Sequence, residues 1–229
     1  MGVAPISLAA TAYDSIKRDI IRCHLVGGAE LTEQHLAQRY ALGKTPVRDA
    51  LRQLAQEGLV QILPRRGYVV RPVSLRDVRE IFALRLLLEP EAARLSAARM
   101  DPALLAELTC LCQVATRTDA SGTIDEILTN HGDFHLAIAR GSRNARLVDI
   151  LGRLLDETDR LFYLGVQVGA WTAALVSEHQ ELLGALATGN GDAAAQIVDS
   201  QIRAFEQRLL AVLRASPRLE AINLAATPT

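Results

Sequence analysis

The chain has 229 residues, of which 49% are hydrophobic, 22% charged and 4% aromatic, and these proportions are typical of an ordinary globular protein. No apolar run reaches the roughly 18 residues that a membrane-spanning helix needs, which excludes a transmembrane protein. The first segment, MGVAPISLAATAYDS, lacks the basic leader and long apolar core of a signal peptide. We therefore expect a cytoplasmic protein without a membrane partner.

Cysteine usage argues against a disulfide framework. The chain has three cysteines, Cys23, Cys110 and Cys112, and no C-x-x-C pair. An odd number without paired spacing also argues against a zinc knot, and free thiols in a reducing cytoplasm fit the pattern better.

Charge is distributed unevenly along the chain, although the net charge is only −1. Residues 1–73 carry ten lysines and arginines against six acids, a net charge of +4. The remainder carries fifteen against twenty, a net charge of −5. We therefore expect only the first part of the chain to contact a polyanion.

Helical spacing of apolar residues predicts a first helix from Leu8 to about Leu25, on Tyr13, Ile16, Ile20 and Ile21. A second helix is expected from Thr32 to Tyr40. A third is expected from Thr45 to Glu57, with Thr45 as its N-cap and Pro46 as its first helical residue. Gly58 should end it as a left-handed cap.

The third helix is expected to be amphipathic. Its apolar stripe should be buried and its basic residues should face outward; the stripe comprises Val47, Leu51 and Leu54, and the basic residues are Lys44, Arg48 and Arg52. Two short alternating runs then predict a hairpin: residues 60–63 and 68–70, with Pro64-Arg65-Arg66-Gly67 at the tip. This order predicts a winged helix-turn-helix domain in residues 1–73, with a recognition helix and a cationic wing.

Such a domain reads the major groove with the N-terminal end of its recognition helix. The amides of the first turn and the Thr45 hydroxyl are expected to hold a phosphate. Lys44 and Arg48 lie at the same end, where an arginine can read guanine O6 and N7. For Arg52 two roles are open, a DNA contact or a pair with Asp49 or Gln56.

At the wing, Arg65, Arg66 and Gly67 are expected to follow the minor groove or the backbone. One such domain offers too little contact for operator affinity. We therefore expect a homodimer that reads a pseudo-palindromic duplex.

The second part of the chain reads as an all-α bundle, residues 74–216, followed by a disordered tail at 217–229. A helix is expected from Leu75 to about Ala98. Helix-capping and helix-breaking residues predict five more helices. One begins at Asp101-Pro102, one runs from the capping box Thr123-x-x-Glu126 to Gly141, and three lie at about 144–164, 171–188 and 192–214.

The run LAQRYALGKTPVRDALRQLAQEGLV resembles the DNA-binding domain of the GntR family of bacterial transcription regulators. The matching residues lie at fixed spacing: Leu36, Ala37, Thr45, Pro46, Val47, Arg48, Ala50, Leu51, Leu54, Glu57, Gly58, Leu59 and Val60. The resemblance implies DNA contacts at Gln34, Lys44, Thr45, Pro46 and Arg48. Two departures are Gly43 in place of a small hydroxyl residue and Val26-Gly27-Gly28 in place of Pro-Gly.

The second part resembles the FCD effector domain, which defines the FadR branch of that family. The resemblance is carried by the pattern LRDVxxIFALRxxLE at residues 75–89, by Phe134-His135 followed by Asn144, and by Glu178-His179. The two resemblances together cover roughly residues 8–214. They imply a dimeric regulator, most often a repressor, whose bundle binds a small organic acid.

Three histidines form the candidate metal site. His131 and His135 lie four residues apart on one expected helix, so their rings share a face, and His179 lies on another. The family pattern implies a divalent metal held by one Asp or Asn and three His. Here His131 occupies the acidic position and Gln201 the position of the third histidine. Imidazole at 131 would suit zinc or nickel, whereas Gln201 is a poorer ligand and could hold water or the effector.

Two alternatives remain open for these residues. The histidines could be ordinary members of a satisfied polar network in the core. Arg85 matches a family position that faces the pocket, where it would pair with an effector carboxylate, but it could instead form a surface or interface salt bridge with Glu89.

A metal-dependent enzyme with a winged-helix docking module is the alternative function. It would need a general base, and the obvious candidate, Glu178, points away from its neighbour His179. No H-E-x-x-H motif, phosphate loop or nucleophile elbow is present. We therefore expect no enzymatic activity.

Overall fold

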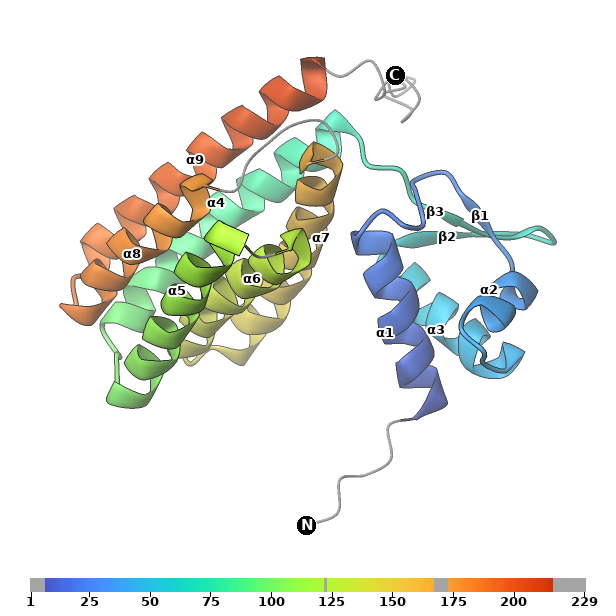
Figure 1. The fold of residues 1–229 in the computed structure, drawn as a ribbon, viewed down its shortest axis with the longest axis horizontal. Helices are drawn as coiled ribbons and strands as arrows, with labels where there is room; N and C mark the ends of the chain where they lie inside the picture. Colours follow the sequence, from blue (N-terminus) through green and yellow to red (C-terminus); the bar gives the residue numbers. More distant parts are fainter. Residues whose placement is uncertain (1–6, 122, 167–172, 216–229) are drawn as a thin grey trace, which may run out of the picture. The chain divides into compact units, whose positions relative to one another are not determined.

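The computed structural model describes residues 7–121, 123–166 and 173–215 (Figure 1). One compact unit ends at Ser74 and a second begins at Leu75. The first, which we call the head, contains these elements: α1 (Leu8–Ile21), β1 (Glu30–Leu31), α2 (Glu33–Arg39), α3 (Lys44–Gln56), β2 (Val60–Leu63) and β3 (Gly67–Val70).

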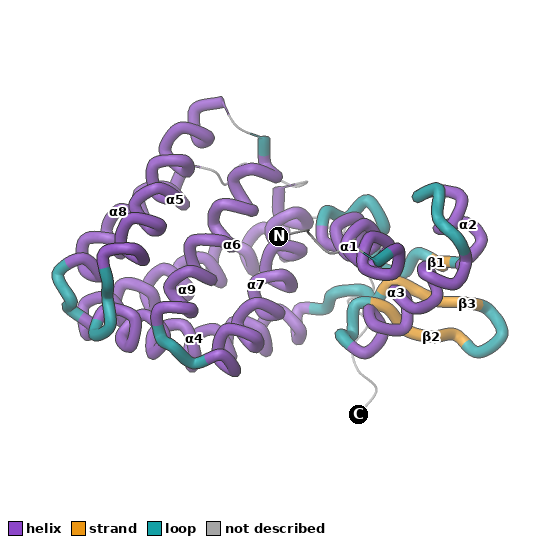
Figure 2. Tube along the Cα trace, turned by 90° about the horizontal axis from the view of Figure 1, so that it is seen from below, coloured by secondary structure: helices purple, strands orange, loops and turns teal. Residues whose placement is uncertain are grey.

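The strands of the head form one small antiparallel sheet in the order β1-β3-β2 (Figure 2). In the β2–β3 hairpin Val60 is opposite Val70 and Leu63 is opposite Gly67, which confirms the expected wing. The strand β1 was not predicted. It has only two residues, too few for an alternating pattern, and it is fixed by long-range pairing of Leu31 with Tyr68.

The start of the recognition helix corrects one prediction. α3 begins at Lys44, and its N-cap is Gly43, which makes no side-chain cap hydrogen bond. The prediction of Thr45 as N-cap is therefore wrong. Pro46 is the third helical residue, where its missing N–H costs little because the first four amides of a helix have no partner within it.

The other helix ends in the head follow local signals. The Thr32 hydroxyl accepts a hydrogen bond from the His35 amide and caps α2. Gly58 has φ +78°, and the Leu59 amide donates to the Leu54 carbonyl at 3.0 Å, which confirms the predicted left-handed cap. α1 ends at Ile21, earlier than predicted, and Cys23 has φ +57° just beyond it.

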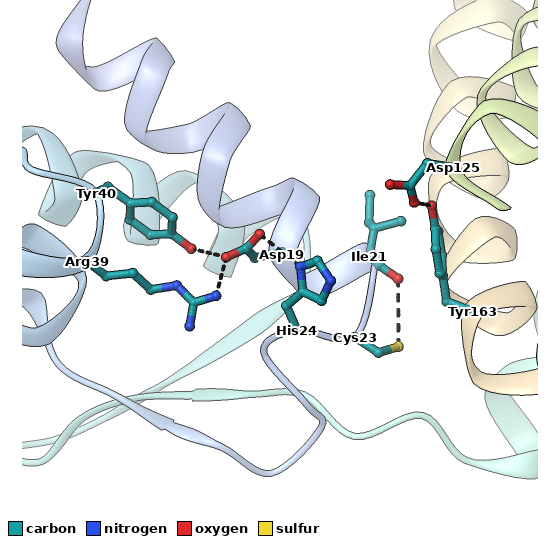
Figure 3. A network of polar contacts seen from close by, with 8 residues as sticks. All are labelled: Asp19, Ile21, Cys23, His24, Arg39, Tyr40, Asp125 and Tyr163. Carbon is teal, nitrogen blue, oxygen red and sulfur yellow. Dashed lines mark hydrogen bonds and ion pairs between the residues drawn. The ribbon is translucent and has the colours of Figure 1, made fainter. Parts of the chain in front are cut away.

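A polar network ties the end of α1 to α2 (Figure 3). The Asp19 carboxylate accepts hydrogen bonds from the Tyr40 hydroxyl at 2.7 Å and from Arg39 Nη2 at 2.6 Å, and His24 Nδ1 lies 3.3 Å away. Burial raises the pKa of Asp19, but these donors outweigh it and lower the pKa below its ordinary value. An ionised Asp19 therefore fixes α2 beside α1.

The head has its own apolar core, built from α1, α2, α3 and the sheet. Its fully or almost fully buried side chains include Ile16, Ile20, Leu31, Leu36, Val47, Leu51, Leu54 and Val70. The predicted inward stripe of α3 is thus confirmed. Burial of these side chains leaves the basic residues of α3 on the exposed face.

The second unit, the bundle, contains α4 (Leu75–Ala97), α5 (Pro102–Ser121), α6 (Ile124–Gly141), α7 (Ala145–Val166), α8 (Ala173–Ala187) and α9 (Gly191–Ala215). It has no strand within its described residues, which confirms the predicted mainly α fold. α4 and α9 lie side by side (Figure 1), and Phe82 packs against Phe205 with ring centroids 5.4 Å apart.

Capping residues begin the bundle helices where the sequence predicts. Thr123 and Glu126 form the capping box of α6 in both directions. Asp101 accepts from the Leu104 amide at 2.9 Å, and Asn144 accepts from the Leu147 amide at 3.3 Å. The expected start of a helix at Trp171 and the tail at 217–229 lie outside the described residues. Nowhere in the described chain is a helix both long and apolar enough to cross a bilayer.

Candidate functional site

The recognition helix presents its basic side chains to solvent. Lys44, Arg48 and Arg52 are exposed on α3, opposite the buried stripe. Thr45 and Gln34 are also exposed, and Pro46 is half-buried. The predicted DNA contacts of the two helices therefore all have side chains that reach the surface.

The wing tip carries the remaining predicted contacts. Arg65 and Arg66 are exposed, and Gly67 is half-buried at the start of β3. Gly67 has φ +108°, and a Cβ there would lie 2.6 Å from the Leu31 carbonyl oxygen. This position therefore requires glycine for the backbone itself, quite apart from any DNA contact.

Two acids that sequence analysis did not single out pair with predicted DNA-contacting arginines. Glu33 accepts from Arg48 Nε at 2.8 Å and from Nη2 at 2.7 Å. Glu30 accepts from Arg66 Nη2 at 2.7 Å. Both pairs join residues that are far apart in sequence, so local spacing carries no signal for them.

The field around Glu33 is strongly positive. Hydrogen bonds from Arg48, with the nearby charges of Arg52 and Lys44, hold the pKa of Glu33 below its ordinary value. For Arg52, the two predicted roles were a DNA contact and a pair with Asp49 or Gln56. The side chain is exposed, and its charge acts on Glu33.

In the bundle, the three histidines come together. His131 and His135 project from α6 and His179 projects from α8, and all three are buried. One ligand nitrogen from each lies within 4.8 Å of the others. His131 Nδ1 and His179 Nε2 are 3.0 Å apart.

Aromatic rings enclose this cluster. Phe134 stacks on His179 with centroids 4.2 Å apart, and Phe162 meets His131 edge-on at 5.6 Å. Burial, with the charge of His135, lowers the pKa of His179 to about 3. Burial also lowers the pKa of His131 well below its ordinary value. Both rings are therefore neutral near pH 7, and neutral imidazole is the form that binds a metal.

A buried ion pair lies behind the histidines. Arg85 Nε donates to Glu89 Oε1 at 2.5 Å, and His135 Nδ1 lies 3.3 Å from Glu89 Oε2. Burial raises the pKa of Glu89, but Arg85 and His135 outweigh it and lower the pKa to about 2. The alternative of a surface or interface salt bridge is thus half right, because Arg85 pairs with Glu89 but is only 2% exposed.

Two buried donor atoms in this region have no hydrogen-bond partner within the described residues: Arg85 Nη1 and His179 Nδ1. A fully satisfied polar network would pair both of these atoms, whereas the 3.0 Å hydrogen bond between His131 and His179 is a contact that such a network would contain. An unpaired buried guanidinium nitrogen can donate a hydrogen bond to an acceptor atom of a bound ligand.

The donor set suits a divalent metal. Ligand nitrogens around one zinc ion, at about 2.0–2.1 Å from it, are roughly 3–3.5 Å apart, and the His131–His179 separation already has this value. The contact from Glu89 to His135 Nδ1 is of the kind that orients a metal-binding imidazole through its other nitrogen.

The neighbouring predicted residues have other positions. Gln201 is half-buried on α9. Asn130, one residue before His131, donates to the Leu111 carbonyl at 3.0 Å. The side chain of Glu178, the base considered for an enzyme, lies outside the described residues. Glu89 was predicted only as a partner of Arg85, and its contact with His135 was not predicted.

Comparisons with known proteins agree for both units. Residues 8–70 match the model of the bacterial regulatory proteins of the gntR family, and residues 80–204 match the model of the FCD domain. An HTH-type transcriptional regulator from an unstable DNA locus of Streptomyces ambofaciens is 28% identical over 94% of this chain and 91% of its own length. The HTH-type transcriptional repressor GlaR of Escherichia coli is 29% identical over 76% and 83%.

A solved structure with the same fold is that of McbR from E. coli. It aligns with a TM-score of 0.81 at 23% identity and covers 90% of this chain and 98% of its own. The named relatives are transcription regulators, which gives no support to the alternative of a metal-dependent enzyme.

Proposed function

Because the chain belongs to the GntR family of bacterial transcription regulators and carries an FCD domain, we propose that it is a repressor released from DNA by a small organic acid. The observation that carries this proposal is the buried cluster in the bundle. Three buried histidines converge there, beside an arginine with an unpartnered buried nitrogen. Repression is supported by relatives such as GlaR, which is a repressor.

We infer that a cytoplasmic homodimer binds a pseudo-palindromic operator through its heads. The predicted contacts are Gln34, Lys44, Thr45, Pro46, Arg48 and Arg52 from the helices, with Arg65, Arg66 and Gly67 from the wing. A single head of this kind reads only a half-site, and two heads give operator affinity.

His131, His135 and His179 would hold zinc or nickel, with Gln201 as a further ligand or an effector contact. The metal would supply a fixed positive charge that binds a carboxylate. Arg85 donates to Glu89 through Nε and keeps Nη1 for a second carboxylate oxygen. A carboxylate is therefore the effector group that these side chains would recognise best.

Release from DNA requires that the acid bind the DNA-incompetent state of the protein more tightly than the competent one. The acid and the operator would then weaken each other's binding by the same factor. This reciprocity makes DNA binding a direct measure of occupancy in the bundle.

Elemental analysis of purified protein tests the metal. We expect near-stoichiometric zinc or nickel in the parent and its loss in a His135→Ala/His179→Ala variant. A His24→Ala/His35→Ala variant is the matched control, because both of these histidines are exposed in the head. A parent that contains no metal after growth with zinc and nickel would contradict this part of the proposal.

A gel shift on the DNA that flanks the protein's own gene tests regulation. Binding should weaken steeply as salt rises, because lysines and arginines release counterions from phosphates. A panel of mono-, di- and tricarboxylates should contain at least one acid that releases the parent but not the double histidine variant. The proposal fails if the parent shifts no duplex at any salt, or if no acid in the panel releases it.

A further inference from the structure

A carboxylate lies next to the cations that the head would present to DNA. Glu33 is half-buried and accepts two hydrogen bonds from Arg48, at 2.8 and 2.7 Å. Its pKa is lowered by Arg48 and by the charges of Arg52 and Lys44, so it is ionised at neutral pH. Three cations expected to meet DNA therefore surround one permanent negative charge.

This negative charge works against simple attraction to DNA. Non-specific affinity comes from cations that neutralise phosphates, and a fixed carboxylate among them lowers that affinity for every sequence. If the head needed only affinity, an uncharged residue at position 33 would serve better. The geometry of the pair indicates what the carboxylate contributes instead.

Glu33 binds one particular edge of the Arg48 guanidinium. Nε and Nη2 form the side edge, and both donate to Glu33. The outer edge, formed by Nη1 and the second proton of Nη2, stays available for two parallel hydrogen bonds. Guanine O6 and N7 accept such a pair. Arg48 is 46% exposed despite the contact, so its outer edge is accessible to a duplex.

We propose that Glu33 is a specificity-determining positioning residue, which holds the guanidinium of Arg48 so that its outer edge reads guanine. This inference rests on the proposed role of Arg48 as a DNA contact. Without Glu33, the flexible side chain of Arg48 can swing to any nearby phosphate, which increases binding to all sequences. Glu33 thus lowers overall affinity and raises discrimination between sequences.

The wing offers a matched control. Glu30 also pairs with a predicted DNA-contacting arginine, Arg66, but through one hydrogen bond, with side chains 57% and 69% exposed. A single exposed contact does not fix the plane of a guanidinium. Loss of the Glu30 charge should therefore strengthen binding to all duplexes about equally.

The test compares two duplexes. One is the sequence that the full-length parent enriches from a random duplex library, and the other is a shuffled duplex of the same composition. Affinity for both is measured by fluorescence anisotropy at fixed salt for the parent and four variants: Glu33→Gln, Glu30→Gln, Arg48→Ala and the Glu33→Gln/Arg48→Ala double variant. Circular dichroism checks that each variant is folded.

We expect Glu33→Gln to lower the ratio of selected to shuffled affinity by about 3- to 10-fold, the cost of ordering a free arginine side chain. Glu30→Gln should leave this ratio unchanged. In the Arg48→Ala background, Glu33→Gln should no longer change the ratio, whereas a general structural role of Glu33 would act in both backgrounds.

An unchanged ratio in folded Glu33→Gln would overturn the inference and leave the proposed function intact. A fall of equal size with and without Arg48 would overturn it as well. If Glu33→Gln does not fold, Glu33→Asp replaces it. Aspartate keeps the charge but is too short for both bonds, so the same fall in the ratio is expected and its absence overturns the inference. A parent that enriches no sequence would overturn the proposed operator binding itself, and the inference with it.

Discussion

The head keeps its charges at the surface, whereas the bundle buries some of its own. Arg48 and Arg66 of the head pair with acids in contact with solvent, which screens the attraction within each pair. In the bundle, Arg85 and Glu89 are 2% and 4% exposed and are held by each other and by His135. Ion pairs of similar length thus have different energetic consequences, because solvent screens one set and not the other.

The largest expected effect comes from breaking the buried pair. Glu89→Ala leaves the Arg85 guanidinium buried without its counter-charge, which should lower the free energy of unfolding by about 3–5 kcal/mol. Urea unfolding followed by circular dichroism measures this change. Glu80→Ala is the matched control, since Glu80 pairs with Arg76 on the same helix at the same spacing but with both side chains exposed. Equal losses in the two variants would break the contrast between buried and exposed pairs.

Acid should destabilise the bundle through its buried histidines. The pKa of His179 is lowered to about 3 in the folded protein, against about 6.5 when unfolded, so the unfolded chain binds protons first as pH falls. The contribution of His179 to the free energy of unfolding is therefore fully present above a pH of about 6.5. Below that pH it falls by about 1.4 kcal/mol per pH unit until the pH reaches the pKa of the folded state. The lowered pKa of His131 acts in the same direction. Glu89 adds to the loss of stability only when the pH falls below the ordinary pKa of a glutamate, 4.5.

Urea unfolding of metal-free protein at a series of pH values measures this slope. His179→Gln should reduce the slope between pH of about 6 and 4, because glutamine does not titrate there. A slope that is unchanged by this substitution would mean that His179 is not kept neutral by burial.

Two helical glycines of the bundle, Gly141 and Gly184, differ in how tightly they are packed. A Cβ at Gly141 would lie 2.1 Å from Ser96 Oγ and 2.6 Å from Leu104 Cδ2. Gly141→Ala should therefore cost about 1–3 kcal/mol through overpacking. At Gly184, also within a helix, a Cβ would meet nothing within 4 Å, so Gly184→Ala should stabilise by about 0.5–1 kcal/mol. Thermal unfolding of both variants checks that the two changes have opposite signs.

Two threonines in the head give the smallest expected effects. Thr32→Ala removes the hydroxyl that caps α2 and should cost about 1 kcal/mol. Thr45→Ala should change stability by less than about 0.5 kcal/mol, because Gly43 and not Thr45 is the N-cap of α3. A larger loss for Thr45→Ala in chemical unfolding would restore the capping role that the structure assigns elsewhere.

These residues also indicate what a single sequence can predict. Features set by neighbouring residues were predictable, such as the capping box at Thr123 and Glu126, the cap at Gly58 and the buried stripe of α3. Thr45 was wrongly predicted as the N-cap because two residues in the same turn, Gly43 and Thr45, could each precede the helix, and the extended residue is Gly43.

Contacts between distant segments were not predictable from local patterns. The two-residue strand β1 exists only through its pairing with β3. The acids at Glu30 and Glu33 meet their arginines across the folded head. In the bundle, the histidines were expected from a family pattern, but the contact of Glu89 with His135 depends on how α4 packs against α6.

The packing of α4 along α9 has a consequence for synthesis of the protein. The first and last helices of the bundle share a core, in which Phe82 meets Phe205, so the bundle cannot close until α9 has left the ribosome. The head needs nothing beyond the end of β3 and can fold while translation continues. A chain that ends before α9 would therefore carry a folded head without a closed bundle, and under the proposed function this head would bind DNA without control by an effector.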